Sequence, residues 1–159
     1  MHLTGEKFTL GIISDTHNLL RPEAVEKLNG SNLIIHAGDI GERKILDDLE
    51  AIAPVVAVRG NVDRAEWCRT LPLTQTLTLS EIKIYVIHNL KVLAIDLHDE
   101  DIQIVISGHS HKPLIENNNG VAFINPGSAG KKKRFKLLIT LATLTITDGN
   151  IDARIIELL

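Results

Sequence analysis

The sequence predicts a single α/β domain, and three observations support this prediction. The chain has 159 residues, a length typical of one domain that buries roughly 70% of its unfolded surface. Strand-like apolar runs alternate with helical segments through the first half, which indicates βαβ units around a parallel sheet. The second half contains strand pairs joined by turn sequences, and no repeat or linker interrupts the chain. We therefore assign residues 1–159 to one domain.

The first half contains three predicted strands and two predicted helices. Continuous apolar runs predict the strands, which lie at residues 8–13, 33–36 and 54–58. Proline is favoured in the first turn of a helix, so Pro22 predicts the start of a helix at residues 22–28. Apolar residues at i, i+1 and i+4 predict a second, amphipathic helix at residues 43–50.

The second half contains mainly predicted strands. They lie at residues 74–79, 82–87, 102–106, 137–147 and 151–158, and two short strands flank a turn at 117–120. Residues 91–97 predict a short helix. Asp148-Gly149-Asn150 predicts a hairpin between the last two strands, because Asp-Gly tolerates the positive φ of tight turns.

Composition and charge disfavour several classes of protein. A net charge of −3 and an aromatic content of 3% offer no strong sign of nucleic-acid binding. The longest apolar stretch, residues 137–146, is too short to span a bilayer, and the first residues lack the apolar segment of a secretory signal. Cys68 is the single cysteine, which fits a reducing compartment. We expect a cytoplasmic protein without membrane contact, whose oligomeric state the sequence leaves open.

Five polar clusters follow apolar runs and carry metal-ligand side chains. They are Asp15-Thr16-His17, Gly38-Asp39, Gly60-Asn61, His88 and Gly108-His109-Ser110-His111. Open α/β sheets bind ligands at the carboxyl ends of their strands, so we expect these side chains to converge on one point. In an extended segment residues i and i+2 point the same way, so each of the pairs Asp15/His17 and His109/His111 would direct two ligands into one cavity.

The mixture of carboxylates, imidazoles and an amide suits Mn²⁺, Fe, Co²⁺, Ni²⁺ or Zn²⁺ better than Ca²⁺. Two divalent ions with the carboxylates of Asp15 and Asp39 and one hydroxide would leave a net positive, water-bearing pocket suited to a phosphate ester. A lone Asp-x-His or His-x-His is more often a surface or hydrogen-bonding pair. The five clusters together predict a two-metal hydrolytic centre.

The order of these motifs resembles the pattern of calcineurin-like metallophosphoesterases, and Ser14-Asp15-Thr16-His17 with Asn125-Pro126-Gly127-Ser128 resembles its small YfcE-type phosphodiesterase branch. The resemblance spans roughly residues 8 to 135. It implies a metallophosphoesterase-type sandwich of two facing mixed β-sheets flanked by helices. It also implies a metal-dependent phosphodiesterase, in which a hydroxide bridging a dinuclear centre attacks phosphorus in a small diester substrate.

The resemblance also assigns roles to individual residues. The first metal would be held by Asp15, His17, Asp39 and His111, and the second by Asp39, Asn61, His88 and His109. Asp39 would bridge the two metals. The residues with catalytic roles would be Asp39, Asn61 and His88. The most strongly expected ion is Mn²⁺, with Ni²⁺, Zn²⁺ and Fe as alternatives. Asp63 and Asn125 are candidates for orienting the ligands; Asp63 could equally be a turn carboxylate, and Asn125-Pro126-Gly127 a type II turn.

Two departures from the family pattern bear on function. Val62 stands where many phosphomonoesterases carry a general-acid histidine, so poor leaving groups should be hydrolysed slowly. The YfcE-type branch also lacks this histidine. Asn89 follows His88 where the family usually has glycine, so His88 is the ligand whose placement is in question.

Two other functions remain as alternatives. A phosphomonoesterase or nucleotidase is disfavoured by Val62. A non-catalytic protein-interaction scaffold has the same fold in a retromer subunit, but the scaffold relatives depart from the catalytic pattern at the position of His17, which this chain retains. Trp67, Leu71 and Leu73 could form a partner patch or a buried cluster, and the basic run at 131–134 could be a solvated face or guide an anionic substrate. His36 is expected to be a hydrogen-bonded core residue.

Overall fold

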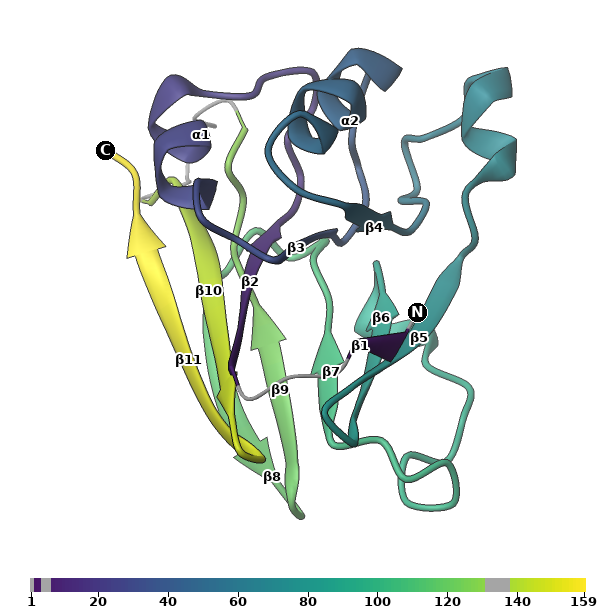
Figure 1. Cartoon of the computed structure of the whole chain (residues 1–159). Helices are drawn as coiled ribbons and strands as arrows, with labels where there is room; N and C mark the ends of the chain where they lie inside the picture. Colours follow the sequence, from purple (N-terminus) through teal and green to yellow (C-terminus); the bar gives the residue numbers. More distant parts are fainter. Residues whose placement is uncertain (1, 4–6, 131–137) are drawn as a thin grey trace.

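The computed structural model describes residues 2–3, 7–130 and 138–159, which form two facing β-sheets (Figure 1). The strand order is β1-β5-β6-β7-β9-β8 in the six-stranded sheet and β11-β10-β2-β3-β4 in the five-stranded sheet. Both sheets contain parallel and antiparallel neighbours. The predicted sandwich of two mixed sheets is therefore confirmed. No helix within the described ranges is long and apolar enough to cross a membrane.

The five-stranded sheet combines a parallel half with a hairpin. Its parallel strands are β2 (Lys7–Ile13), β3 (Leu33–His36) and β4 (Val55–Ala57), and its hairpin strands are β10 (Thr140–Thr147) and β11 (Asn150–Glu157). The helices α1 (Pro22–Leu28) and α2 (Arg43–Glu50) connect the parallel strands and have the bounds that the sequence predicts. The parallel half is therefore two βαβ units, as expected.

The six-stranded sheet is built mainly from the second half of the chain. Its strands are β1 (His2–Leu3), β5 (Thr74–Leu79), β6 (Ile82–Ile87), β7 (Ile104–Ile106), β8 (Leu114–Asn118) and β9 (Val121–Asn125). A short 3₁₀ helix, η1 (Glu66–Thr70), precedes β5, and another, η2 (Leu90–Val92), follows β6. Strands β6, β7 and β9 run parallel, so their carboxyl ends lie at the same edge.

The predicted helix at residues 91–97 is wrong beyond its first turn. Only η2 forms, and the chain then crosses the outer face of the six-stranded sheet without regular structure. Leu93, Ile95 and Leu97 alternate with Ala94 and Asp96 and pack on that face as an extended segment would. The side chain of Asp96 accepts the backbone N–H groups of His98 and Asp99, a local bonding pattern that competes with helix.

Three apolar layers stabilise the described part of the sandwich. The first lies between the sheets, the second lies between α1, α2 and the outer face of the five-stranded sheet, and the third covers the outer face of the six-stranded sheet. Leu10 and Ile12 of β2 face the first layer, whereas Ile13 faces the second. A strand buried on both faces has to be a continuous apolar run, which explains why β2 and β3 are recognisable in the sequence.

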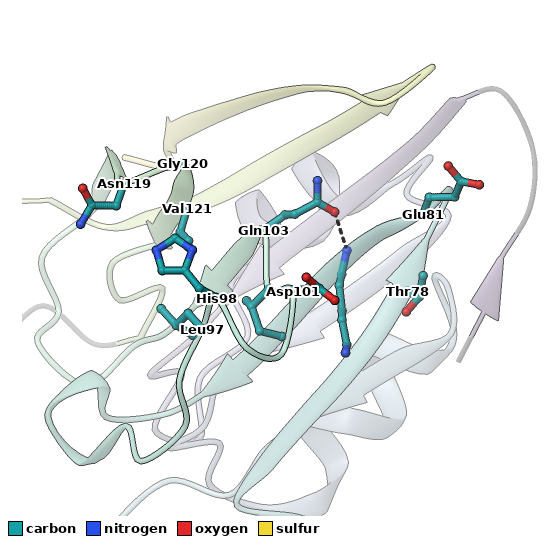
Figure 2. Close-up of a pocket in the computed structure, with 11 residues that line it drawn as sticks. Thr78, Glu81, Leu97, His98, Asp101, Gln103, Asn119, Gly120 and Val121 are labelled. Atoms are coloured by element: carbon teal, nitrogen blue, oxygen red, sulfur yellow. Dashed lines mark hydrogen bonds between the residues drawn. The ribbon is translucent and has the colours of Figure 1, made fainter.

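A polar hollow of about 530 Å³ lies at the amino ends of β6, β7 and β9 (Figure 2). His98, Asp101 and Asn119 are among its lining residues, and the backbone N–H of Lys83 donates to Gln103 there. None of the described residues that line it belongs to the predicted metal set. The predicted ligands all follow the opposite, carboxyl ends of their strands.

Candidate metal centre

The side chains predicted as metal ligands converge at the carboxyl edge of the two sheets. Ligand-type atoms of Asp15, His17 and His111 lie within 4.8 Å of one another, and those of Asp39, His88 and His109 form a second group with the same spacing. These residues follow β2, β3, β6 and β7. The expected convergence is therefore present, and it produces two adjacent groups.

Asp39 and Asn61 connect the members of these groups. Oδ2 of Asp39 lies 3.7 Å from Nε2 of His17 in the first group and 3.3 Å from Nε2 of His88 in its own group. Oδ1 of Asn61 lies 3.0 Å from Nε2 of His88 and 3.3 Å from Nδ1 of His109. Asn61 therefore lies with the second group, and Asp39 lies between a histidine of each group.

Two buried polar atoms in the first group lack hydrogen-bond partners among the described residues. These atoms are Oδ1 of Asp15 and Nε2 of His17. Nε2 of His111 approaches Oδ1 of Asp15 to 3.2 Å, but without hydrogen-bond geometry. Leaving a buried polar atom unpaired costs about 1–3 kcal/mol. A divalent cation between these atoms would remove that cost, so the residues present fit a metal.

The backbone at the ligands is strained. Positive φ values occur at Asp15, His17, Asp39, His109 and His111, between 44° and 70°. The expectation that each Asp-x-His or His-x-His pair projects from an extended segment is therefore wrong. Non-glycine residues adopt this left-handed region at a cost of roughly 1–2 kcal/mol each. Such strain clusters at functional sites, where the surrounding structure enforces a geometry that the local chain disfavours.

Two glycines of the motifs allow the loops to approach one another. A Cβ atom on Gly60 would collide with the backbone nitrogen and Oδ1 of Asp39, and one on Gly108 would collide with Oγ of Ser14. The glycine before Asn61 and the glycine before His109 are therefore required by contacts between strand ends that are distant in the sequence.

Asp63 and Asn125 both bind the backbone of ligand-bearing loops. Oδ2 of Asp63 accepts the N–H groups of Asp39 at 2.9 Å and Gly60 at 2.8 Å, and Oδ1 accepts that of Ile40 at 2.9 Å. Nδ2 of Asn125 donates to the carbonyl oxygen of Gly108 at 2.9 Å. Each side chain thus holds a loop that presents candidate ligands.

His88 is well placed in spite of Asn89. Asn89 has φ −113° and ψ 109°, an extended conformation that needs no glycine. Nδ1 of His88 lies 2.7 Å from the carbonyl oxygen of Ala37, which can only accept, so Nδ1 carries the proton. In a neutral ring Nε2 is then unprotonated, and it faces Asp39. This is the orientation that a metal-binding histidine requires.

The electrostatics of the site favour ionised carboxylates. Burial by itself would raise the pKa of Asp15, but contacts from His111, His17 and the Ser14 hydroxyl hold it well below its usual range. Burial opposes ionisation of Asp39 as well, and His88 with the backbone N–H of Val62 lowers its pKa. Burial disfavours a charged His88, yet Asp39 raises its pKa above the ordinary value. The carboxylates are anionic near neutral pH and attract cations.

Sequence reasoning assigned no role to two serines that support Asp15. Oγ of Ser14 donates to Oδ2 of Asp15 at 2.6 Å, and Oγ of Ser128 donates to its carbonyl oxygen at 2.9 Å. Both serines stand within the motifs that carry the family resemblance, and that position could have identified them as functional residues.

Two residues considered as a partner patch, Trp67 and Leu71, are partly buried and pack against the helical layer. The basic run at 131–134 lies outside the described residues.

The sequence is similar to those of known metallophosphoesterases. The sequence model of the calcineurin-like phosphoesterase superfamily domain matches residues 8–149. A probable metallophosphoesterase from Methanocaldococcus jannaschii is 36% identical over 148 residues, covering 80% of this chain and 73% of that protein. A phosphodiesterase from the same organism is 28% identical over 136 residues, covering 74% of this chain and 82% of its own length.

Solved structures share the fold at lower identity. A novel archaeal phosphodiesterase has a TM-score of 0.78 and 24% identity, covering 94% of this chain and 99% of its own. Vacuolar protein sorting 29 from Cryptosporidium parvum has a TM-score of 0.77 and 20% identity, covering 96% of this chain and 98% of its own. One of these structures is described as an enzyme and the other as a sorting protein, so the shared architecture alone does not assign an activity.

Proposed function

The chain belongs to the calcineurin-like phosphoesterase superfamily, and on this premise we propose that it is a metal-dependent phosphodiesterase with a dinuclear centre. One observation carries the proposal. Oδ2 of Asp39 faces an imidazole of each ligand group, His17 at 3.7 Å and His88 at 3.3 Å. A carboxylate placed between two sets of ligands is the arrangement that two neighbouring cations require.

The residues present would divide between two ions. The first ion would be held by Asp15, His17 and His111, and the second by His88, His109 and Asn61. Asp39 would bind both ions. When bound, divalent ions would activate water as a nucleophile and neutralise charge on the phosphoryl oxygens. The protein holds the ligands in position through Asp63, Asn125 and Ser14, each of which contacts a ligand-bearing loop.

The preference for diesters rests on Val62. This residue directly follows Asn61, and its side chain is 49% exposed beside the centre but cannot donate a proton. A leaving group at this position has to depart without protonation by the residue after Asn61. The similarity to a curated phosphodiesterase supports the same preference. A phosphomonoesterase would need another proton donor.

We propose Mn²⁺ as the working ion, with Ni²⁺, Zn²⁺ and Fe as alternatives that the same ligand types accept. A small phosphodiester is the proposed substrate. The cytoplasm is the proposed location, since the cysteine Cys68 is free and buried, as suits a reducing compartment.

Hydrolysis of bis(p-nitrophenyl) phosphate by metal-stripped protein with Mn²⁺ restored tests the proposal. Nitrophenolate leaves without protonation, so Val62 does not mask activity. The Asp39→Asn variant should lose Mn²⁺-dependent turnover, because it weakens the ligand shared by both ions. The matched control is Asp152→Asn on β11, whose carboxylate is exposed and pairs with Arg154.

The outcomes distinguish the alternatives. Retained turnover in Asp39→Asn would exclude the two-metal mechanism. Two bound ions per chain without turnover of any diester would favour the non-catalytic scaffold, the second candidate function that the fold permits.

A further inference from the structure

A second hollow, of about 380 Å³, opens directly beside the candidate metal centre. Asn61 and His88, which belong to the second ligand group, are part of its lining. The remaining walls come from the start of β5, from β6 and from the η2 segment. The hollow therefore shares two side chains with the centre, and a group attached to a phosphorus atom at the centre would lie next to it.

The walls of the hollow are apolar and unusually exposed. Leu73 is 61% exposed and Val92 is 65% exposed, and among the large apolar side chains in the described parts of the chain only the terminal Leu159 is more exposed. Both line this one hollow, together with the buried residues Tyr85 and Ile87. Single exposed apolar residues are ordinary, whereas an apolar concavity next to a reactive centre marks a binding site.

The hollow lies at the edge of an apolar cluster on the outer face of the six-stranded sheet. Tyr85 and Ile87 belong to this cluster, and Leu93, Ile95 and Leu97 pack against it. Tyr85 and Ile87 are buried, whereas Leu73 before β5 and Val92 at the end of η2 remain exposed. These four side chains line the hollow together.

Charge and size restrict the occupant. Among the described residues that line the hollow, Arg59 has the one permanently charged side chain, and none has a carboxylate. A cationic substituent would be repelled there, whereas neutral or anionic groups would not. The volume lies near the lower limit of ligand pockets, about 300–1,000 Å³, which suits a ring system. A rigid ring buries apolar area with less loss of rotational freedom than an alkyl chain of equal size.

We propose that this hollow binds an aromatic substituent of the phosphodiester substrate, an aryl group or a nucleobase, between Leu73, Val92 and Tyr85. This assignment rests on the proposed function, because it takes the reacting phosphorus to lie at the metal centre. It makes Leu73 and Val92 specificity-determining residues. The ring would cover the two most exposed apolar side chains beside the site.

Two diesters with the same leaving group test the proposal. The ratio of kcat/KM for phenyl p-nitrophenyl phosphate to that for methyl p-nitrophenyl phosphate is measured in the Mn²⁺-loaded protein and in a Leu73→Ser/Val92→Ser variant. The two esters differ in intrinsic reactivity, but this difference is the same for both proteins and cancels when their kcat/KM ratios are compared. The ratio should fall about tenfold in the variant, the size of effect typical of lost apolar pocket contacts. Ile115→Ser on β8, a 42% exposed apolar residue outside the hollow, is the matched control and should keep the ratio.

Binding of non-hydrolysable compounds gives an independent readout. Isothermal titration calorimetry of the Zn²⁺-loaded protein should show that phenylphosphonate binds about tenfold more tightly than methylphosphonate. The double variant should lose this difference, and Ile115→Ser should retain it. Equal affinities in the wild-type protein, no binding of the phenyl compound, or an unchanged preference in the double variant would each overturn the assignment. If the wild-type protein hydrolyses neither ester, the phosphodiesterase proposal fails. The calorimetry still tests whether the hollow binds an aromatic group.

Discussion

The carboxylate of Asp63 lies 2.9 Å from the backbone nitrogen of Asp39 and accepts its N–H group. The same carboxylate binds the N–H groups of Ile40 and Gly60, so one buried side chain connects the loop after β3 to the loop after β4. These loops carry Asp39 and Asn61. The relative position of two candidate ligands therefore depends on a residue that itself need not touch a metal.

Replacing Asp63 with Asn should destabilise the protein and weaken metal binding. An amide offers one acceptor oxygen in place of two, so at least one buried N–H group loses its partner. The free energy of unfolding should fall by about 1–3 kcal/mol, and affinity for Zn²⁺ by about ten- to a hundredfold. Urea unfolding of the metal-free protein and a chelator competition measure the two effects. Asp152→Asn is the control, and an Asp63→Asn protein indistinguishable from it would refute the positioning role.

Replacing Ser14 with Ala should lower metal affinity with a smaller effect on stability. The hydroxyl donates to Oδ2 of Asp15 at 2.6 Å and helps to hold the pKa of that carboxyl low. Without it, Asp15 loses a group that orients it and favours its ionised form. We expect about tenfold weaker Zn²⁺ binding near neutral pH. Thr147→Ala, at the exposed end of β10, serves as the control, and equal affinities of the two variants would contradict the prediction.

Replacing Val62 with His should create activity on phosphomonoesters with poor leaving groups. The exposed side chain of Val62 follows Asn61, and its backbone N–H to Asp39 does not depend on the side chain. An imidazole there would supply a general acid, an effect of about 10²–10⁴ when well placed. The measurement is kcat/KM for phenyl phosphate, where a gain of at least about tenfold is expected. Val62→Gln, which is polar but cannot transfer a proton near neutral pH, should show no such gain; an equal gain in both variants would contradict acid catalysis.

His36 should make the stability of the metal-free protein depend on pH between about 4 and 6.5. Thr16 donates its hydroxyl proton to Ile40, so Nε2 of His36 donates to Thr16, while Nδ1 accepts the N–H of Gly38. Protonating Nδ1 would break the second bond, and complete burial lowers the pKa of His36 to about 4.

The unfolded chain binds this proton near pH 6.5, whereas the folded protein does so near pH 4. The stability linked to neutral His36 is therefore complete above pH 6.5 and is lost as pH falls towards 4, by about 3 kcal/mol in total. Urea unfolding at several pH values measures it. His36→Gln should reduce the slope in this window, and an unchanged slope would show that His36 does not titrate as described.

The sequence was most informative where structure depends on local pattern. Helices α1 and α2 have their predicted bounds, because proline at a helix start and an apolar stripe act within a few residues. Strands β2 and β3 were recognisable because both of their faces are buried. The order of the polar motifs after these strands was sufficient to predict which side chains would meet.

The sequence by itself determined the types of element, their order and the chemical identity of the candidate ligands, since these follow from periodicity and side-chain chemistry. Only the tertiary structure decided how the ligands are presented. The left-handed backbone at Asp15 and His109 is unfavourable locally, and contacts between loops of different strands enforce it. The hollow lined by Leu73 and Val92 likewise brings together residues from the loop after β4, from β5, from β6 and from η2. Both features depend on contacts between residues distant in the chain, which no local pattern encodes.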